Sequence, residues 1–282
     1  MINWPQELVD DFESRRVILF IGSGVSRNSV GADGITRPKT WESFLIEAAR
    51  QHALLDRIQP HLTRKDYLTA LDLLRNSISR DQYARIVRRE YLEPRYSEAP
   101  IHESIYKLDA KIILTPNFDK IYDIYAQAKS RGTVIIKQYY DLDLARFIRG
   151  DQRVVIKAHG SVDSVENMIF GRKDYAEARV KHRWFYEILK ALFLTHSFVF
   201  VGCGADDPDI RLVLEDIHFS AGYAREHYFI SAQGSIPEDM KTIFQQTMNL
   251  NILEYDYDSN ADDHSDLSTS LEDLANSLSF NQ

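Results

Sequence analysis

The sequence predicts an α/β fold, a doubly wound parallel sheet with a helical insertion that forms a small lobe. Three observations support this prediction. Short apolar segments rich in β-branched residues recur along the chain, helical patterns separate most of them, and residues 40–108 hold helical patterns without a convincing strand. Alternating strands and helices are typical of parallel sheets that are covered by helices on both faces.

Seven segments have the length and composition of strands. Their near-continuous apolar character fits strands that are buried on both faces of a parallel sheet. The expected strands cover residues 17–21, 112–114, 134–136, 154–156, 198–201, 228–230 and 252–253.

Helices are expected between these strands, where apolar residues recur with a period of 3.6. They cover residues 41–55, 83–92, 118–128, 184–194 and 210–217. The interval 40–108 is too long for one crossover helix, so we expect a helical lobe inserted within a single domain that spans residues 1–282. An acidic, turn-rich segment, 256–266, is predicted to be a loop before a short last helix.

Charge and cysteine content exclude several classes of protein. The 282 residues carry 42 acidic and 34 basic side chains, a net charge of −8, so we expect no direct binding to nucleic acid. A single cysteine, Cys203, cannot close an internal disulfide or supply a four-cysteine zinc site, which favours a reducing, cytoplasmic setting and no metal. No signal peptide is apparent, and no apolar run approaches the ~20 residues that span a bilayer.

A glycine-bearing loop directly follows the first strand. Gly22-Ser23-Gly24 lets backbone N–H groups approach a phosphate closely, because no glycine side chain blocks the approach. Arg27 stands where the dinucleotide-binding fingerprint has its third glycine, so the match to that motif is partial. A tight strand–helix turn without a ligand explains the loop equally well.

Polar residues follow the second strand in Thr115-Pro116-Asn117-Phe118-Asp119. The amide of Asn117 both donates and accepts hydrogen bonds, which suits it to hold a sugar hydroxyl or a water molecule. The spacing alone favours a simpler role, because Asn is a common N-cap and Asp is common in the first turn of a helix.

Two further strand ends carry candidate functional residues. His159-Gly160 follows strand 154–156, and an imidazole at this edge of a sheet is suited to act as a general base. The alternative is that His159 has a purely structural role and donates a hydrogen bond to a backbone carbonyl. Gly202-Cys203-Gly204 follows strand 198–201 and offers a second glycine-rich loop, in which Cys203 is better explained as a small buried residue than as a nucleophile.

Taken in this order, four motifs resemble those of sirtuin-like proteins, the silent-information-regulator-2-like superfamily. Residues 22–26 resemble its opening glycine loop, and residues 115–119 are similar to its Thr-x-Asn-x-Asp motif. His159-Gly160 matches its catalytic His-Gly pair, and residues 202–208 resemble its late nucleotide-binding loop. The resemblance covers residues 14–257 and implies a Rossmann-like fold.

Two departures from the pattern indicate which branch the chain resembles. Sirtuin deacylases carry a zinc ribbon of two paired cysteines, and one cysteine cannot build it. The Pro-Asp-Phe-Arg element of deacylases is also missing, and Pro38 and Trp41 look like a minimal bacterial branch. The chain therefore resembles bacterial antiviral NAD-cleaving effectors, including the effector domain of Thoeris-type systems.

The resemblance implies hydrolysis of NAD+ to nicotinamide and ADP-ribose by an NAD-depleting effector of antiphage defence that acts by abortive infection. It assigns the general base to His159, the binding of the nicotinamide ribose or the attacking water to Asn117, and the orientation of that network to Asp119. The implied contacts with NAD+ come from Gly22, Ser23, Gly24, Ser26, Pro38, Trp41, Thr115, Gly160, Gly202, Cys203, Gly204 and Asp207.

Two alternatives stay open on the sequence. An NAD-dependent protein deacylase would share the cofactor loops, and a non-catalytic subunit of a larger complex would bind NAD or ADP-ribose with the same fold. The expected partners are NAD+ and ADP-ribose, further copies of the chain in a homo-oligomer, and a separate regulatory protein such as an ATPase. We expect no membrane partner.

Overall fold

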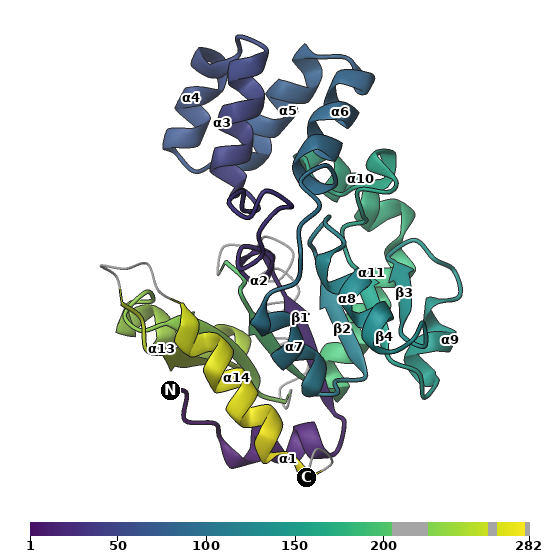
Figure 1. Ribbon diagram of the computed structural model, residues 1–282, viewed down its shortest axis with the longest axis vertical. Coiled ribbons are helices and arrows are strands. Elements are labelled where there is room, and N and C mark those ends of the chain that lie inside the picture. The colour runs from purple at the N-terminus through teal and green to yellow at the C-terminus, as the bar shows by residue number, and fades with distance from the viewer. Residues whose placement is uncertain (205–224, 259–263, 280–282) are drawn as a thin grey trace.

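The structure is a computed structural model that describes residues 1–204, 225–258 and 264–279 (Figure 1). All seven predicted strands are present, and all but β1 are longer than expected, by one to four residues. Their bounds are β1 Val17–Ile21, β2 Ile112–Thr115, β3 Ile135–Gln138, β4 Val154–Lys157, β5 Ser197–Val201, β6 His227–Ala232 and β7 Leu250–Tyr255.

The strands form one sheet in the order β3-β4-β2-β1-β5-β6-β7, and every neighbouring pair is parallel. The chain first builds the half of the sheet on one side of β1 and then crosses to the other side to add β5, β6 and β7. The predicted doubly wound α/β fold is therefore confirmed. In open sheets of this kind, ligands bind beyond the carboxyl ends of the strands where the order reverses, which here is the junction of β1 and β5.

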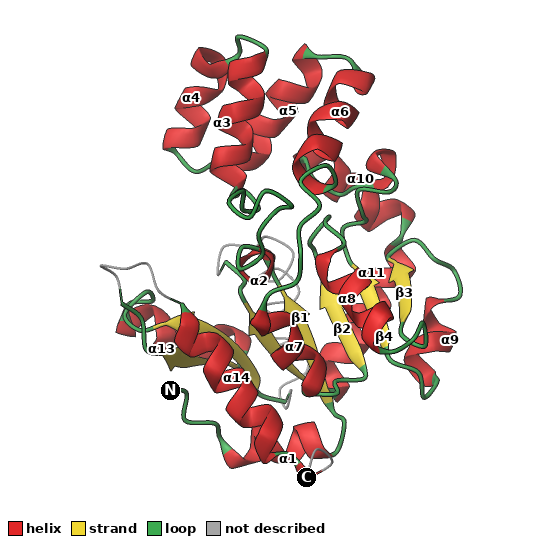
Figure 2. Cartoon of the chain, in the orientation of Figure 1, coloured by secondary structure: helices red, strands yellow, loops and turns green. Residues whose placement is uncertain are grey.

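Helices cover both faces of the sheet (Figure 2). Each face has its own apolar core, because alternate residues of a strand point to opposite sides. One core joins the strands to α1 (Gln6–Glu13), α7 (Pro100–Lys107), α8 (Ile121–Lys129) and α14 (Ser265–Ser277). The other joins them to α9 (Leu144–Arg149), α10 (Arg172–Lys181), α11 (Arg183–Thr195) and α13 (Glu238–Met248).

Four helices form a separate group beyond α2 (Ser23–Ser26), at the carboxyl ends of the strands (Figure 1). They are α3 (Trp41–Gln51), α4 (Leu55–Thr63), α5 (Tyr67–Ser77) and α6 (Arg80–Tyr91). Side chains of Thr40, Asp66 and Ser79 cap the N-termini of α3, α5 and α6, which explains where these helices begin. We refer to α3–α6 as the helical lobe.

The lobe has an apolar core of its own, which includes Leu45, Leu71 and Val87. The last helix of the 40–108 interval, α7, packs elsewhere, because Ile101 and Ile105 belong to the core on the sheet. We therefore propose that the inserted lobe comprises residues 41–91, with α7 as part of the layer that covers the sheet.

All four predicted helices that fall on described residues begin or end at other residues than expected, by one residue at each end for α11 and by more for the others. The helix predicted over 41–55 ends at Gln51, because Ala53 adopts a left-handed conformation (φ 55°) and the N–H of Leu54 bonds back to the carbonyl of Ala49 at 2.8 Å. The helix predicted from residue 118 begins at Ile121, so residues 116–120 form a loop after β2. The helix predicted over 210–217 lies outside the described residues.

The predicted last helix is confirmed as α14, which begins at Ser265 and so includes the last two residues of the acidic segment 256–266. No helix among the residues that the structure describes is both long and apolar enough to cross a membrane.

Candidate active site

The two glycine-bearing loops after β1 and β5 lie directly against each other. The N–H of Gly22 donates to the carbonyl of Val201 at 2.9 Å, and the N–H of Gly24 donates to that of Gly202 at 2.8 Å. A Cβ on Gly22 or Gly24 would lie 2.5 or 2.8 Å from the Gly202 oxygen, and Gly202 itself has φ +64°. These glycines therefore let the loops meet, and the N–H groups of Gly22 and Gly24 are already bonded within the chain.

The loop after β2 reaches across to the loop after β1. The hydroxyl of Thr115, which is buried, donates to the carbonyl of Ile21 at 2.7 Å and accepts from the N–H of Asn117 at 3.1 Å. Thr115 therefore fastens the ends of β1 and β2 together and fixes the backbone of Asn117.

Asn117 uses both hydrogens of its side-chain amide within the chain. Nδ2 donates to the carbonyl of Gly22 at 2.9 Å and to Ser26 Oγ at 3.1 Å. The Gly22 carbonyl can only accept, so it fixes which amide atom is the nitrogen. In the part of the chain that the structure describes, Asn117 Oδ1 accepts no hydrogen bond, so it is the atom left to bind a ligand. Asn117 is also not the N-cap that its spacing suggested, because α8 begins four residues later.

Asp119 and Ser26 complete this network. Ser26 Oγ donates to Asp119 Oδ2 at 2.8 Å, and Asp119 Oδ1 accepts from the N–H of Ile121 at 3.0 Å at the start of α8. Both side chains are buried, with exposed fractions of 4% for Ser26 and 6% for Asp119. Because both side chains are hydrogen-bonded to other residues of the chain, their role is to hold Asn117 and the two loops in place.

His159 follows β4, the strand next to β2. Thr115 pairs with Lys157 in the register of these strands, so Asn117 and His159 each stand two residues beyond a paired position. His159 is buried at 6% exposure, and its ring lies edge-on to that of Tyr175, with centroids 5.2 Å apart. Gly160 has φ +81°, and a Cβ there would lie 2.7 Å from the carbonyl oxygen of Asn167. Glycine is therefore required directly after His159.

Lys157 is a functional candidate that the sequence reasoning missed. It is only 1% exposed, and its Nζ donates to the backbone carbonyl of Asp119 at 2.6 Å and pairs with Asp123 Oδ2 at 3.1 Å. Burial raises the pKa of the Asp123 carboxyl. A buried ion pair is costly to form. The sequence signal for it was a lysine at the end of an otherwise apolar strand, since Lys157 directly follows Val154, Val155 and Ile156 in β4.

The late loop contributes Cys203 and Gly204. Cys203 Sγ lies 3.5 Å from the carbonyl oxygen of Phe20, and its side chain packs against the apolar core on the sheet. Gly204 is exposed. The predicted ligand contact Asp207 lies outside the described residues.

Pro38 and Trp41 lie with the helical lobe. Pro38 is buried, and the Trp41 ring packs edge-on against Phe170 with centroids 4.4 Å apart. Ser23 is the exposed residue of the first glycine loop.

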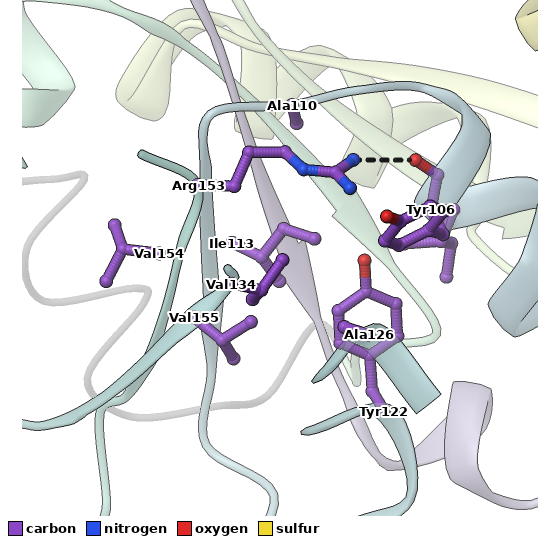
Figure 3. A pocket seen from close by; sticks show the side chains of 10 residues that line it. Tyr106, Ala110, Ile113, Tyr122, Ala126, Val134, Arg153, Val154 and Val155 are labelled. Atoms are coloured by element: carbon purple, nitrogen blue, oxygen red, sulfur yellow. Dashed lines mark hydrogen bonds between the residues drawn. The ribbon is translucent and has the colours of Figure 1, made fainter. Parts of the chain in front are cut away.

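A pocket opens at the opposite edge of the sheet, away from these residues (Figure 3). It lies beside Ala110, Val134 and Val154, which stand at the amino ends of β2, β3 and β4. Arg153 crosses it, with its guanidinium 4.0 Å from the ring centroid of Tyr106 and bonded to that residue's carbonyl oxygen at 3.1 Å. The pocket therefore shares no residue with the network around Asn117.

No metal centre accompanies the site within residues 1–204, 225–258 and 264–279, where no three His, Cys, Asp or Glu side chains come together in a way that would hold an ion.

A model of the SIR2-like domain family matches residues 111–253, half of the chain. The chain belongs to the SIR2-like family. The matched region contains three of the four motifs described above, those at residues 115–119, 159–160 and 202–208. The resemblance that the sequence motifs suggested is therefore confirmed.

Curated relatives of this SIR2-like chain include a protein named as a defence-associated sirtuin and proteins named as NAD+ hydrolases. "Defense-associated sirtuin 2" of Bacillus subtilis is 20% identical over 89% of this chain and 25% of that protein. "NAD(+) hydrolase ThsA" of Enterococcus faecium is 28% identical over 46% of this chain and 27% of that protein, and the protein of the same name from Cytobacillus dafuensis is 22% identical over 79% and 42%. The chain thus spans about a quarter of the length of the first two relatives.

A solved structure described as "Structural Basis for the Mechanism and Regulation of Sir2 Enzymes" aligns with 96% of this SIR2-like chain and 94% of that chain. The identity is 11% and the TM-score is 0.44.

Proposed function

We propose that this chain hydrolyses the N-glycosidic bond of NAD+ to give nicotinamide and ADP-ribose, and that it serves as an NAD-depleting effector of bacterial antiphage defence. The observation that carries the proposal is the amide of Asn117. Both of its hydrogens are held by Gly22 and Ser26, so Oδ1 is presented as an acceptor at the carboxyl ends of the strands. The relatives named as NAD+ hydrolases and as a defence-associated sirtuin support the same activity.

The chemistry requires positioning and a base. The bond between nicotinamide and C1′ of its ribose breaks with the electron pair on nicotinamide, which departs as a neutral molecule and needs no general acid. The transition state is oxocarbenium-like, as in glycoside hydrolysis. Water adds to C1′, and its proton passes to His159 and from there to solvent.

Asn117 Oδ1 accepts a hydrogen bond from a hydroxyl of the nicotinamide ribose or from the attacking water. Ser26 and Asp119 hold the amide in that orientation, and a fixed acceptor lowers the barrier because it needs no rearrangement during the reaction.

The remaining contacts with NAD+ are assigned by position. The exposed Ser23 and the backbone of Gly22 and Gly24 flank the pyrophosphate, while Gly202 and Gly204 line the adenosine side. Ser26 and Thr115 act within the chain, since their hydroxyls are buried and bonded to other residues.

The experiment that tests the proposal incubates the purified chain with NAD+, once alone and once with an acetyl-lysine peptide, and separates the products by chromatography. Nicotinamide and ADP-ribose formed without the peptide support the hydrolase. Loss of NAD+ only with the peptide, together with an O-acetylated product, would show a deacylase. Binding of ADP-ribose in calorimetry without any loss of NAD+ would show a non-catalytic subunit.

A further inference from the structure

One short segment, residues 169–175, contacts His159 at both of its ends. At the first end, the N–H of Ile169 donates to the backbone carbonyl of His159 at 2.9 Å. At the other end, the buried ring of Tyr175 lies edge-on to the imidazole with an interplanar angle of 82°. The position of the imidazole therefore depends on how this segment is held.

The middle of the same segment is held by the helical lobe. Phe170, which is 1% exposed, lies in the core of the lobe, with its ring 5.6 Å from that of Phe44 in α3. Next to it, a Cβ on Gly171 would lie 2.2 Å from Asp72 Oδ1 of α5. The lobe and the start of α10 are therefore in direct contact.

Asp174 joins the lobe to the first turn of α10. Its Oδ2 accepts from the N–H of Gly171 at 2.8 Å and from that of Phe170 at 3.2 Å, which fixes where the helix begins. The same oxygen pairs with Nη1 of Arg75 in α5. The two side chains are only partly exposed, 32% for Arg75 and 18% for Asp174, so water weakens their attraction less than at an open surface.

We propose that Arg75 and Asp174 are positioning residues for His159, through which the lobe holds the imidazole in its working orientation. Asp174 acts through Tyr175, the next residue in the same helical turn. The proposal rests on the proposed function, in which His159 is the base. In this proposal the helical lobe contributes to catalysis, because it orients His159.

Kinetics give the first test. In Arg75→Met the imidazole loses its fixed orientation, so we expect kcat for NAD+ to fall about ten-fold, while KM stays within about two-fold because the NAD+ contacts are untouched. Arg75→Lys, which keeps the charge, restores most of kcat. The control is Lys181→Met, which removes an ion pair with Glu177 on the solvent side of the same helix and leaves kcat unchanged.

An NMR signal of the imidazole tests the positioning without any turnover. In protein labelled at histidine, the His159 signal is assigned from its loss in His159→Gln and carries the ring-current shift of Tyr175. It should move in Arg75→Met, return in Arg75→Lys and stay in place in Lys181→Met. An unchanged signal and kcat in a folded Arg75→Met protein would overturn the proposal.

A second variant covers the case in which Arg75→Met unfolds. Asp174→Asn keeps a side-chain acceptor for the two N–H groups and loses the charge that Arg75 holds, so the same shift of the His159 signal is expected. If the wild-type chain leaves NAD+ intact, the proposed function fails, while the His159 signal still decides whether the lobe positions the imidazole.

Discussion

The hydroxyl of Ser26 donates a hydrogen bond to the carboxylate of Asp119 at 2.8 Å, although the two residues are 93 positions apart in the sequence. The same hydroxyl accepts a hydrogen bond from Nδ2 of Asn117 at 3.1 Å. One small side chain thus connects the loop after β1 with both Asn117 and Asp119 in the loop after β2. The orientation of Asn117 depends on this connection.

Ser26→Ala should therefore cost both stability and activity. It removes one hydrogen-bond partner from each of Asp119 and Asn117, which keep the N–H of Ile121 and the carbonyl of Gly22. We therefore expect the free energy of unfolding to fall by about 1–3 kcal/mol, and kcat for NAD+ to fall with it. Urea unfolding and initial rates measure the two effects. Ser29→Ala is the matched control, because Ser29 Oγ is buried and has no partner among the described residues, so its removal should cost little. Equal losses in the two variants would contradict the network.

The contact between the two glycine-bearing loops predicts a contrast between two glycines. Gly24→Ala places a Cβ 2.8 Å from the carbonyl oxygen of Gly202 and should lower the melting temperature by several degrees. Gly204→Ala meets no atom of the described residues within 4 Å and should leave the melting temperature unchanged. If the two variants melt alike, the loops do not touch as described.

The buried pair of Lys157 and Asp123 predicts non-additive mutations. Lys157→Met leaves Asp123 without its cation and should lower the free energy of unfolding by about 3–5 kcal/mol. Adding Asp123→Leu removes the unpaired acid, so the double variant should be more stable than Lys157→Met alone. Simple addition of the two single effects in chemical denaturation would show that the residues do not interact.

His227 predicts a pH dependence of stability. Burial lowers the pKa of His227 to about 4, so its imidazole is neutral in the folded chain at pH 6. The unfolded chain takes up the proton below about pH 6.5, so the folded state loses stability as the pH falls from 6.5 towards 4, on the order of 3 kcal/mol in total.

The measurement is the urea midpoint between pH 7.5 and pH 5 in the wild type and in His227→Asn. The Asn side chain does not titrate and offers an oxygen near the position of Nδ1, which accepts from the N–H of Phe198 at 3.2 Å. The wild type should lose more stability on acidification than the variant. Parallel pH curves would contradict the assignment.

The sheet could be predicted from the sequence because its signal is local. All five residues of β1 and all five of β5 are buried, and β1 and the last four residues of β5 are unbroken apolar runs. The motifs at the strand ends were found for the same reason, since a parallel sheet collects them at one edge.

The connections within the site could not be predicted, because they depend on contacts between distant segments. Nothing near Ser26 indicates that its hydroxyl meets Asp119, and the local pattern around Asn117 favoured a helix cap over a loop. The ring of Trp41 packs on Phe170 in the lobe, and its contact with NAD+ remains a prediction. Asp207 remains a prediction, because it lies outside the described residues.

The most direct measurement of the central claim is the time course of nicotinamide and ADP-ribose formation from NAD+ by purified wild type, His159→Ala and Asn117→Ala, each shown to be folded by its thermal unfolding. The account predicts that the wild type forms the two products in equal amounts and that each variant is slower by about 100-fold or more. Undiminished activity in both folded variants, or a wild type that leaves NAD+ intact, would contradict it.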